Sequence, residues 1–497
     1  MFDKSIFSFC LCSKQMERSF EKVFEAKYSI GEMNLLVDDR TPLQHSELDR
    51  REIIIFGYAV NVITGESDNL AENMLKEVDD FQQAVDYEKN IGGKYIIFYR
   101  EDERVYCMGD ATCSVPVFYT TGLTDIVCCS NPRIIIDTYN LKPDKKLQKI
   151  RNSGPLNQAM PFDVTPYREI KQLIPNHYID VSQQIAKRFK NCSKKQKSIS
   201  PEKAAEITAP MIDKIANMYL SKFKVYCPLT SGRDSRVVYA FLYDMSNDVS
   251  SYTIWKDSFE KDNQDWTIPV SLAALTKTKH EQIYKESISE EMKSTIDNIL
   301  GVNSYPQDAF VLSVTVNKHY SGCATIEGDI IGQVGKCSLH RDIPLFLATP
   351  GYFRCKLHNY SNEAKRFLKL WLQDVKKSGE MVNSFDLFSI ENRLGVWASQ
   401  THLLRNVIGQ PYVNIFNSRS IIYTWTAVNR AERMQSKIHI SLIKHKCPEL
   451  LRVPFEKEPS GLINFAKSNA VVFYFATFVK YYIQRKKFLK NKTEPKQ

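Results

Sequence analysis

A short polar turn between an apolar run and an amphipathic run constrains the fold of this 497-residue chain more than any other feature. The turn is Leu229-Thr230-Ser231-Gly232-Arg233-Asp234-Ser235. The run at 223–227 before it predicts a strand, and the run at 237–242 after it predicts a helix capped by Asp234 or Ser235. Main-chain N–H groups at such a helix start bind anions, and the helix dipole adds to the attraction. The turn therefore predicts a nucleotide-phosphate loop; the simpler alternative is a surface turn, in which Ser, Gly and Asp are common.

Strands and helices alternate around and after this turn. The expected strands at 223–227, 251–255, 281–284 and 323–326 are interleaved with expected helices at 235–244 and 265–277. This alternation predicts an α/β fold with a doubly wound parallel sheet, and the pattern becomes helical from about residue 360.

The first part of the chain has a different pattern, with many short strands, tight turns and one expected early helix at 69–87. It ends in a stretch rich in Lys, Ser and Asn. We therefore expect a first domain at 1–185, a basic linker at 186–200, a second domain at 201–480 and a basic tail at 481–497.

Composition is that of a soluble globular protein, with 43% hydrophobic and 25% charged residues. No run of about 18 apolar residues predicts a transmembrane helix, and the N-terminus lacks the pattern of a secretory signal. The 12 cysteines include no C-x-x-C pair and no zinc-ligand spacing. We expect free thiols in a reducing compartment, and hence a cytoplasmic protein.

The net charge of +10 comes from two segments, 187–197 and 480–497, which together carry +12. The rest of the chain is close to neutral, which argues against a nucleic-acid-binding surface. We interpret the two basic segments as a solvated linker and a tail. An aromatic-rich stretch precedes the tail, so weak contact with an anionic membrane surface stays open beside a terminal helix packed on the core.

The turn at 229–235 is not a Walker loop, since G-x-x-x-x-G-K-[ST] is absent. It resembles the S-G-G-x-D-S pyrophosphatase loop of enzymes that split ATP into AMP and pyrophosphate. Gly232, Asp234 and Ser235 match that motif directly. Thr230 stands at the first serine and Ser231 at the first glycine, where a side chain would stand close to the pyrophosphate.

Further stretches, in the same order, make most of the chain similar to the asparagine synthetase family. They are the glycine-led strand at 92–99, the segment at 109–119, Ser130-Asn131, the segment at 161–178 and the segment at 411–414. The resemblance implies an Ntn-hydrolase-like glutaminase β-sandwich first. A synthetase domain of the adenine nucleotide α-hydrolase type, with a helical C-terminal part, then follows.

The first domain departs from this family at its nucleophile. The family uses a cysteine directly after the initiator methionine, whose own α-amine serves as the base. Here Phe2 occupies that position, and the nearest thiols are Cys10 and Cys12. We predict that the domain keeps its fold but does not hydrolyse glutamine.

In the second domain the resemblance implies binding of ATP and Mg²⁺. Asp234 would hold one metal ion. A second acid is expected in Ile326-Glu327-Gly328-Asp329, a loose match to the family's G-x-G-x-D-E, with Asp329 preferred over Glu327; the alternative is that both only cap a loop. Arg433 and Lys437 lie where the family keeps a basic residue near the polyphosphate. Asp265 is expected to be a helix N-cap.

The leading prediction is an ATP-dependent carbon–nitrogen ligase. It would activate a carboxylate, aspartate or a related acid, as an acyl-adenylate and use ammonia or an amine instead of glutamine. Two alternatives remain: a catalytically degenerate homologue that serves as a scaffold, and another pyrophosphatase-loop enzyme such as a tRNA-modifying one. The sequence leaves the formation of a homodimer open.

Overall fold

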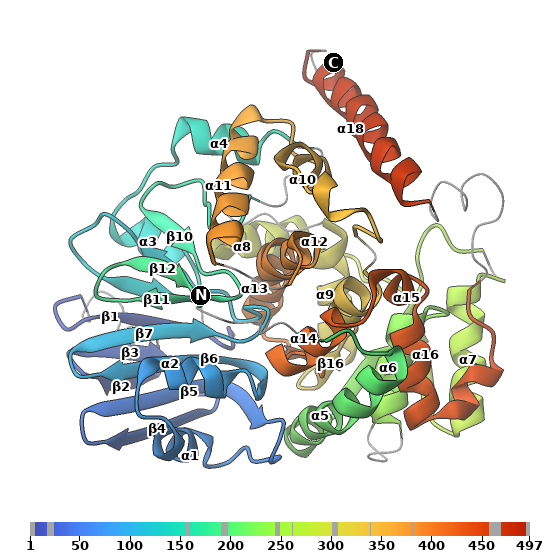
Figure 1. Cartoon of the computed structure of the whole chain (residues 1–497), viewed down its shortest axis with the longest axis horizontal. Coiled ribbons are helices and arrows are strands. Elements are labelled where there is room, and N and C mark those ends of the chain that lie inside the picture. The colour runs from blue at the N-terminus through green and yellow to red at the C-terminus, as the bar shows by residue number, and fades with distance from the viewer. Residues whose placement is uncertain are drawn as a thin grey trace.

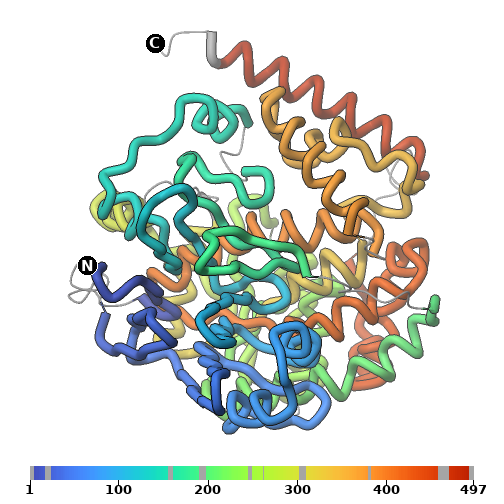
Figure 2. The backbone as a smooth tube through the Cα atoms, turned by 60° about the vertical axis from the view of Figure 1, so that its left-hand side comes forward, coloured from blue at the N-terminus to red at the C-terminus, as the bar shows by residue number. Residues whose placement is uncertain are grey.

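The computed structural model describes residues 5–16, 24–154, 160–189, 197–243, 249–260, 262–300, 307–337, 339–378, 382–456 and 469–493 (Figure 1). Phe2 and residues 190–196 of the expected linker lie outside these residues. The strand-rich half and the half with the parallel sheet lie side by side, and the C-terminal helix runs along the outside (Figures 1 and 2).

The first half contains two antiparallel six-stranded sheets. One has the order β10-β8-β9-β1-β3-β2 and the other the order β12-β11-β7-β6-β5-β4. The strands of the first are β1 (Phe9–Ser13), β2 (Ala26–Ile30), β3 (Met33–Val37), β8 (Phe118–Thr120), β9 (Val127–Cys129) and β10 (Ile170–Gln172). Those of the second are β4 (Leu43–Leu48), β5 (Arg51–Asn61), β6 (Ile91–Glu101), β7 (Arg104–Gly109), β11 (His177–Asp180) and β12 (Ile185–Arg188).

The two sheets pack face to face because alternate residues of each strand point to opposite sides. Phe9 of β1 contacts Phe56 of β5 and Phe98 of β6, with ring centroids 6.1 and 5.6 Å apart. Ile55 and Ile97, one residue earlier along their strands, belong to a separate core on the far face of the second sheet. The expected β-sandwich is therefore present.

Helices cover both outer faces of the sandwich, which gives four layers. On the second sheet lie α1 (Leu70–Glu77), α2 (Phe81–Glu88) and α5 (Pro201–Lys222). On the first lie α3 (Arg133–Thr138), α8 (Glu290–Leu300), α9 (Gln307–His319) and α13 (Ser399–Ile408). A further short helix, α4 (Lys145–Arg151), follows α3. The single helix expected at 69–87 is broken in two, because Asp80 caps α2 by accepting a hydrogen bond from Gln83 N.

The second half is built on a five-stranded parallel sheet with the order β15-β14-β13-β16-β17. Its strands are β13 (Val225–Pro228), β14 (Val249–Ile254), β15 (Lys279–Ile283), β16 (Ala324–Ile326) and β17 (Tyr412–Val413). Helices α6 (Arg233–Leu242) and α7 (Gln264–Thr276) connect the first three strands. The structure therefore has the parallel sheet of an α/β fold that the sequence predicted.

The remainder of the chain is mainly helical. It comprises the π-helical segments η2 (Ile331–Gly335) and η4 (Ser389–Ala398), the 3-10 turns η3 (Leu345–Leu347) and η5 (Pro448–Arg452), and helices α10 (Pro350–Lys356), α11 (Asn362–Ser378), α12 (Ser384–Phe388), α14 (Arg419–Thr426), α15 (Arg430–Met434), α16 (Lys437–Lys446) and α18 (Ala470–Thr493). None of the described helices is both long enough and apolar enough to cross a bilayer.

Two of the segment boundaries expected from the sequence fall inside regular secondary structure. Strand β12 runs to Arg188, so the first residues of the expected linker belong to the second sheet, where they pair with β11. Helix α18 continues without a break through residue 480, so the tail expected from 481 begins inside a helix.

The two halves meet at β6 and the segment after β17. Gly93 donates its N–H to the Asn417 carbonyl at 2.9 Å, and the Asn417 side chain donates to the Gly93 carbonyl at 2.7 Å. A glycine is required at position 93, because φ is +133° and a Cβ would lie 2.1 Å from the Tyr58 carbonyl oxygen. The buried Lys94 donates from Nζ to the Asn406 side chain at 2.8 Å and the Tyr412 carbonyl at 3.2 Å.

Candidate functional site

A cavity lies where the strand order of the parallel sheet reverses. From β13 the chain winds outward through β14 and β15, then returns to place β16 on the other side of β13. Ligands of open α/β sheets bind in the crevice at the carboxyl ends of the strands beside such a reversal. The loop at 229–235 follows β13, the loop at 327–329 follows β16, and both line one cavity of about 350 Å³.

The loop after β13 leads directly into α6. The helix begins at Arg233, with Gly232 as an N-cap that offers no side-chain hydrogen bond. The cap expected at Asp234 or Ser235 is therefore wrong, because both side chains have other partners. The Ser235 hydroxyl accepts the N–H of Thr230 at 3.1 Å, which closes the turn. With no side-chain cap, the N-terminus of α6 is suited to an anionic ligand.

Ser231 points away from the cavity. Its main-chain N–H and its hydroxyl both donate to the Asp265 carboxylate, at 3.1 and 2.6 Å. Asp265 is not the N-cap of α7; Asn263 takes that role by accepting the N–H of Asp265 at 2.9 Å. The side chain at the motif's glycine position is thus accommodated behind the loop, and only Leu229, Thr230, Asp234 and Ser235 of the seven loop residues line the cavity.

Arg236 holds the loop from the other side. Its buried guanidinium donates to the carbonyls of Leu450, Val453 and Pro454, and at 3.4 Å to that of Ser231. It also stacks on Phe455, with 4.0 Å between Cζ and the ring centroid. The loop is therefore fixed between α7 and the segment that follows α16.

Asp234 is oriented by a histidine from the far end of the sequence. Its Oδ1 lies 2.8 Å from Nε2 of the fully buried His439 on α16. Burial alone would raise the pKa of Asp234, but the hydrogen bond and charge of His439 outweigh burial and lower it. Its Oδ2 packs against Gly332, where a Cβ would lie 2.6 Å away. The side chain is 42% exposed and faces the cavity.

Two further carboxylates lie near the guanidinium of Arg405, which contacts one of them. Arg405 on α13 donates to Glu327 at 3.4 Å and packs over Tyr412, while Asp329 accepts a hydrogen bond from Asn414 at 2.5 Å. Burial raises the pKa of both Glu327 and Asp329, and Arg405 only partly offsets that effect. The residues that line the cavity therefore include more carboxylate side chains than cationic ones.

The rest of the wall supplies one more cation and an apolar face. Lys256, just after β14, lies 5.3 Å from the Phe259 ring centroid. The apolar members of the lining include Ile254, Phe259, Leu312 and Val316. An anionic group near α6 and a flat apolar group against this wall would both find complementary surfaces.

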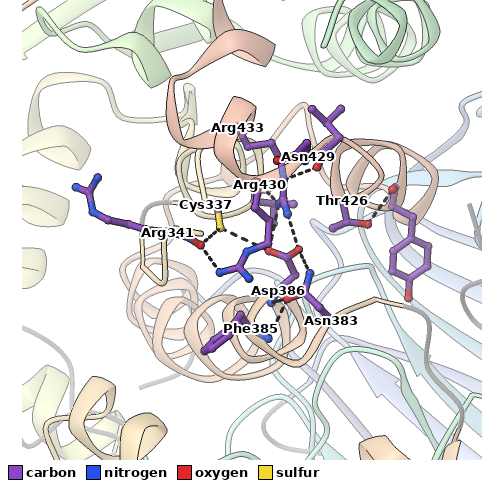
Figure 3. Close-up of polar contacts among 12 residues, drawn as sticks. Cys337, Arg341, Asn383, Phe385, Asp386, Thr426, Asn429, Arg430 and Arg433 are labelled. Atoms are coloured by element: carbon purple, nitrogen blue, oxygen red, sulfur yellow. Dashed lines mark hydrogen bonds and ion pairs between the residues drawn. The ribbon is translucent and has the colours of Figure 1, made fainter. Parts of the chain in front are cut away.

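The two basic residues predicted as catalytic do not line the cavity. Arg433 is fully buried and donates to Asp386 from both terminal nitrogens, at 3.1 and 2.6 Å, within the cluster drawn in Figure 3. Lys437 is 45% exposed and pairs with Glu432 at 3.0 Å. A buried guanidinium needs a carboxylate partner, and Asp386 fills that requirement inside the core.

The predicted metal ligands Asp234, Asp329 and Glu327 all line the cavity, but the three do not form a ready-made metal site. Within the described ranges, no group of three or more His, Cys, Asp or Glu side chains is placed to hold a metal ion. Mg²⁺ is usually bound through one or two carboxylates together with substrate phosphates, so the oxygen donors of Asp234 and Asp329 fit that ion.

A larger hollow of about 900 Å³ lies between the edge of the sandwich and α11. Its charged groups are largely paired with one another. Lys171 meets Asp163 at 3.1 Å, and Arg188 meets Asp374 at 2.7 Å and also pairs with Glu391. The hollow is thus less suited to a charged ligand than the cavity beside β13.

The thiols nearest the N-terminus are inaccessible. Cys10 and Cys12 are buried in the middle of β1, between β3 and β9. Burial raises the pKa of Cys10 well above its ordinary value, which disfavours the nucleophilic thiolate.

No family model and no curated protein matches the sequence. Among solved structures, an allosteric regulatory enzyme of purine biosynthesis is similar at 9% identity, with 65% of this chain and 69% of that chain covered and a TM-score of 0.25. Glutamine phosphoribosylpyrophosphate amidotransferase from B. subtilis, complexed with ADP and GMP, is similar at 9% identity, with 66% and 70% covered and a TM-score of 0.20. At TM-scores this low we draw no inference from either.

Proposed function

We propose that the cavity at the reversal of the parallel sheet binds ATP and activates a carboxylic acid as an acyl-adenylate, as in the asparagine synthetase family. The main observation behind this proposal is that the 229–235 loop and Asp329 line the same cavity, at the point where the strand order reverses. This arrangement supports a phosphate site at the start of α6 with acidic groups opposite it.

In the proposed reaction, a carboxylate oxygen of the acceptor attacks the α-phosphorus of ATP. The bond to the β-phosphate breaks and pyrophosphate leaves. Nitrogen of ammonia or an amine then attacks the acyl carbon, AMP leaves, and the nitrogen gives up a proton to solvent. Aspartate or a related acid remains the proposed acceptor.

We assign each group of residues at the cavity a role according to its position. The N-terminus of α6 near Asp234 and the cation Lys256 would bind the phosphates, and the apolar wall at Ile254 and Phe259 would receive the base. Arg405 would bind the acceptor carboxylate. Asp234 and Asp329 would hold Mg²⁺, which supplies neutralisation of charge on the departing pyrophosphate.

For the first half we propose a bracing role without glutaminase activity. The buried positions of Cys10 and Cys12 support this proposal. Purified protein incubated with glutamine should release glutamate no faster than buffer does. Release at a rate that an active-site thiol reagent abolishes would contradict it.

Calorimetric titration with ATP and Mg²⁺ tests the proposed binding site. Wild-type protein should bind, and Lys256→Met should weaken binding about tenfold or more, because a charge-assisted contact is lost. Lys437→Met is the matched control, since that lysine lies outside the cavity and should leave affinity unchanged. Absence of binding by folded protein would overturn the proposal.

The competing candidate is a scaffold without catalysis. It is favoured by one observation: Ser231 and Asp234 have protein partners, Asp265 and His439, without any ligand. A folded protein that binds neither ATP nor pyrophosphate would support this candidate. Binding and turnover that require tRNA would instead indicate a tRNA-modifying enzyme.

A further inference from the structure

The outward face of α18 is apolar, unlike that of an ordinary surface helix. Five residues recur at intervals of four, four, three and seven: Val471, Phe475, Val479, Tyr482 and Leu489. Their exposed fractions are 49, 62, 60, 54 and 47%, and the adjacent Ile483 is 49% exposed. At 1.5 Å per residue the stripe is about 27 Å long. Surface helices of globular proteins normally present polar residues to solvent, and a contiguous apolar patch marks an interaction site.

A neighbouring face of the same helix, about 100° around its axis from the stripe, is anchored to the protein. Tyr474 stacks on Tyr352 of α10, with centroids 5.2 Å apart and planes inclined by 14°. Tyr481 donates its hydroxyl to the Asn359 carbonyl at 2.9 Å. Because the inner face is already packed, the stripe is not an unused core face of a loose helix. Both Figure 1 and Figure 2 show α18 along the outer rim of the molecule.

The charges around the stripe are all of one sign. Between 470 and 491 the helix has no acidic residue and five exposed basic ones: Lys480, Arg485, Lys486, Lys487 and Lys490. Helical geometry places Arg485 along one edge of the stripe and Lys480 and Lys487 beyond the other. Lys486 lies within the stripe, with its Nζ 4.8 Å from the centroid of the Tyr482 ring. Apolar side chains flanked by Lys and Arg match an anionic lipid surface, where headgroup charge and acyl chains are both within reach.

We propose that α18 docks this protein on an anionic membrane surface, with the helix lying in the plane of the headgroups. The apolar stripe enters the boundary between headgroups and acyl chains, and the flanking cations contact lipid phosphates and carboxylates. The proposal is independent of the ligase function, since the residues of the stripe are not among those lining the cavity.

Cosedimentation of the full chain with vesicles tests the proposal. Vesicles of phosphatidylcholine with roughly 30% phosphatidylserine should bind the protein at low salt, pure phosphatidylcholine much less, and added salt should weaken binding. The pair Phe475→Ser and Val479→Ser should lower binding about tenfold or more. The pair Arg485→Gln and Lys487→Gln should lower it about thirtyfold at low salt.

Leu370→Ser on α11 is the matched control, since that leucine is similarly exposed, at 52%, but is not part of the stripe. It should leave vesicle binding unchanged, and circular dichroism should show all variants folded. The proposal is overturned if anionic vesicles do not bind the protein, or if the stripe variant binds as well as wild type. It is also overturned if the stripe instead holds two copies together, seen as a dimer in sedimentation velocity that the stripe variant abolishes.

Discussion

Two clusters of arginine and carboxylate in this protein have opposite environments. Arg433 meets one carboxylate, Asp386, and both are almost fully buried, so the charges are matched and closed off. Arg405 faces two carboxylates, Glu327 and Asp329, at the wall of a cavity, and only part of that charge is matched. The sequence resemblance points to both clusters. The Arg433 cluster is buried and its charges are matched, so it stabilises the fold. The Arg405 cluster lines a cavity and has unmatched charge, so it is suited to binding and catalysis.

We expect the largest effect on stability when the cation of the buried Arg433 cluster is removed. Arg433→Met leaves Asp386 buried without its cation, so we expect the free energy of unfolding to fall by about 3–5 kcal/mol. Lys437→Met, which breaks only an exposed ion pair, should cost about 1 kcal/mol or less. Urea denaturation measures both. Equal small losses would mean that the Arg433 cluster is not the structural element described above.

A substitution in the Arg405 cluster should change activity much more than stability. Asp329→Asn keeps the shape and the hydrogen bond to Asn414 but removes a negative charge from the cavity. We expect the rate of ATP–pyrophosphate exchange to fall about 100-fold or more, as for the loss of one transition-state contact. The same urea titration should show a loss of stability much smaller than that of Arg433→Met. Unchanged exchange would remove Asp329 from the proposed site.

The buried Lys94 behind Arg405 predicts a pH dependence of stability. Burial lowers its pKa to about 7, an effect that Asp110 opposes and Arg405 reinforces. The unfolded chain holds this proton up to a pKa of about 10.4. Between these values the unfolded state binds more protons, so Lys94 makes stability rise with pH, by at most about 1.4 kcal/mol per unit.

Below pH 7 the destabilising contribution of Lys94 is complete, and above about pH 10 it is absent. Lys94→Met should remove this slope and raise the free energy of unfolding at pH 7. Denaturation series at pH 7, 8 and 9 compare the two proteins. Parallel curves for wild type and variant would show that Lys94 does not cause the dependence.

The smallest effect concerns the position where the loop departs from its motif. Ser231→Ala loses the hydroxyl bond to Asp265 and should cost about 1–2 kcal/mol of stability. Ser231→Gly restores the motif, yet it should not increase exchange, because the serine side chain already points away from the cavity. A clear gain of activity in Ser231→Gly would show that the serine obstructs the phosphate.

The architecture follows from local patterns that the sequence displays. Alternating strands and helices predicted the parallel sheet, and expected strand starts lie within two residues of β13, β14, β15 and β16. The strand-rich pattern predicted β-structure in the first half, and the family resemblance implied the sandwich. The start of α6 was missed, because Gly232 offers no side-chain signal and the caps expected at 234 and 235 bond elsewhere.

The site itself was only partly predictable. The loop and the acids after β16 follow strands, so the topology brings them together. His439 lies 205 residues from Asp234, and Lys256 follows a different strand, so no local pattern identifies either. Arg433 was predicted as catalytic from its place in the order of motifs. Only the three-dimensional partner, Asp386, shows that its charge is already used.

The most direct test of the central claim is ATP–[³²P]pyrophosphate exchange with Mg²⁺, screened over aspartate and a panel of carboxylic acids. The account predicts exchange that requires one of these acids and is lost in Asp234→Asn, while Lys437→Met behaves as wild type. Exchange that persists in Asp234→Asn, or no exchange with any acid by protein that is folded and binds ATP, would contradict it.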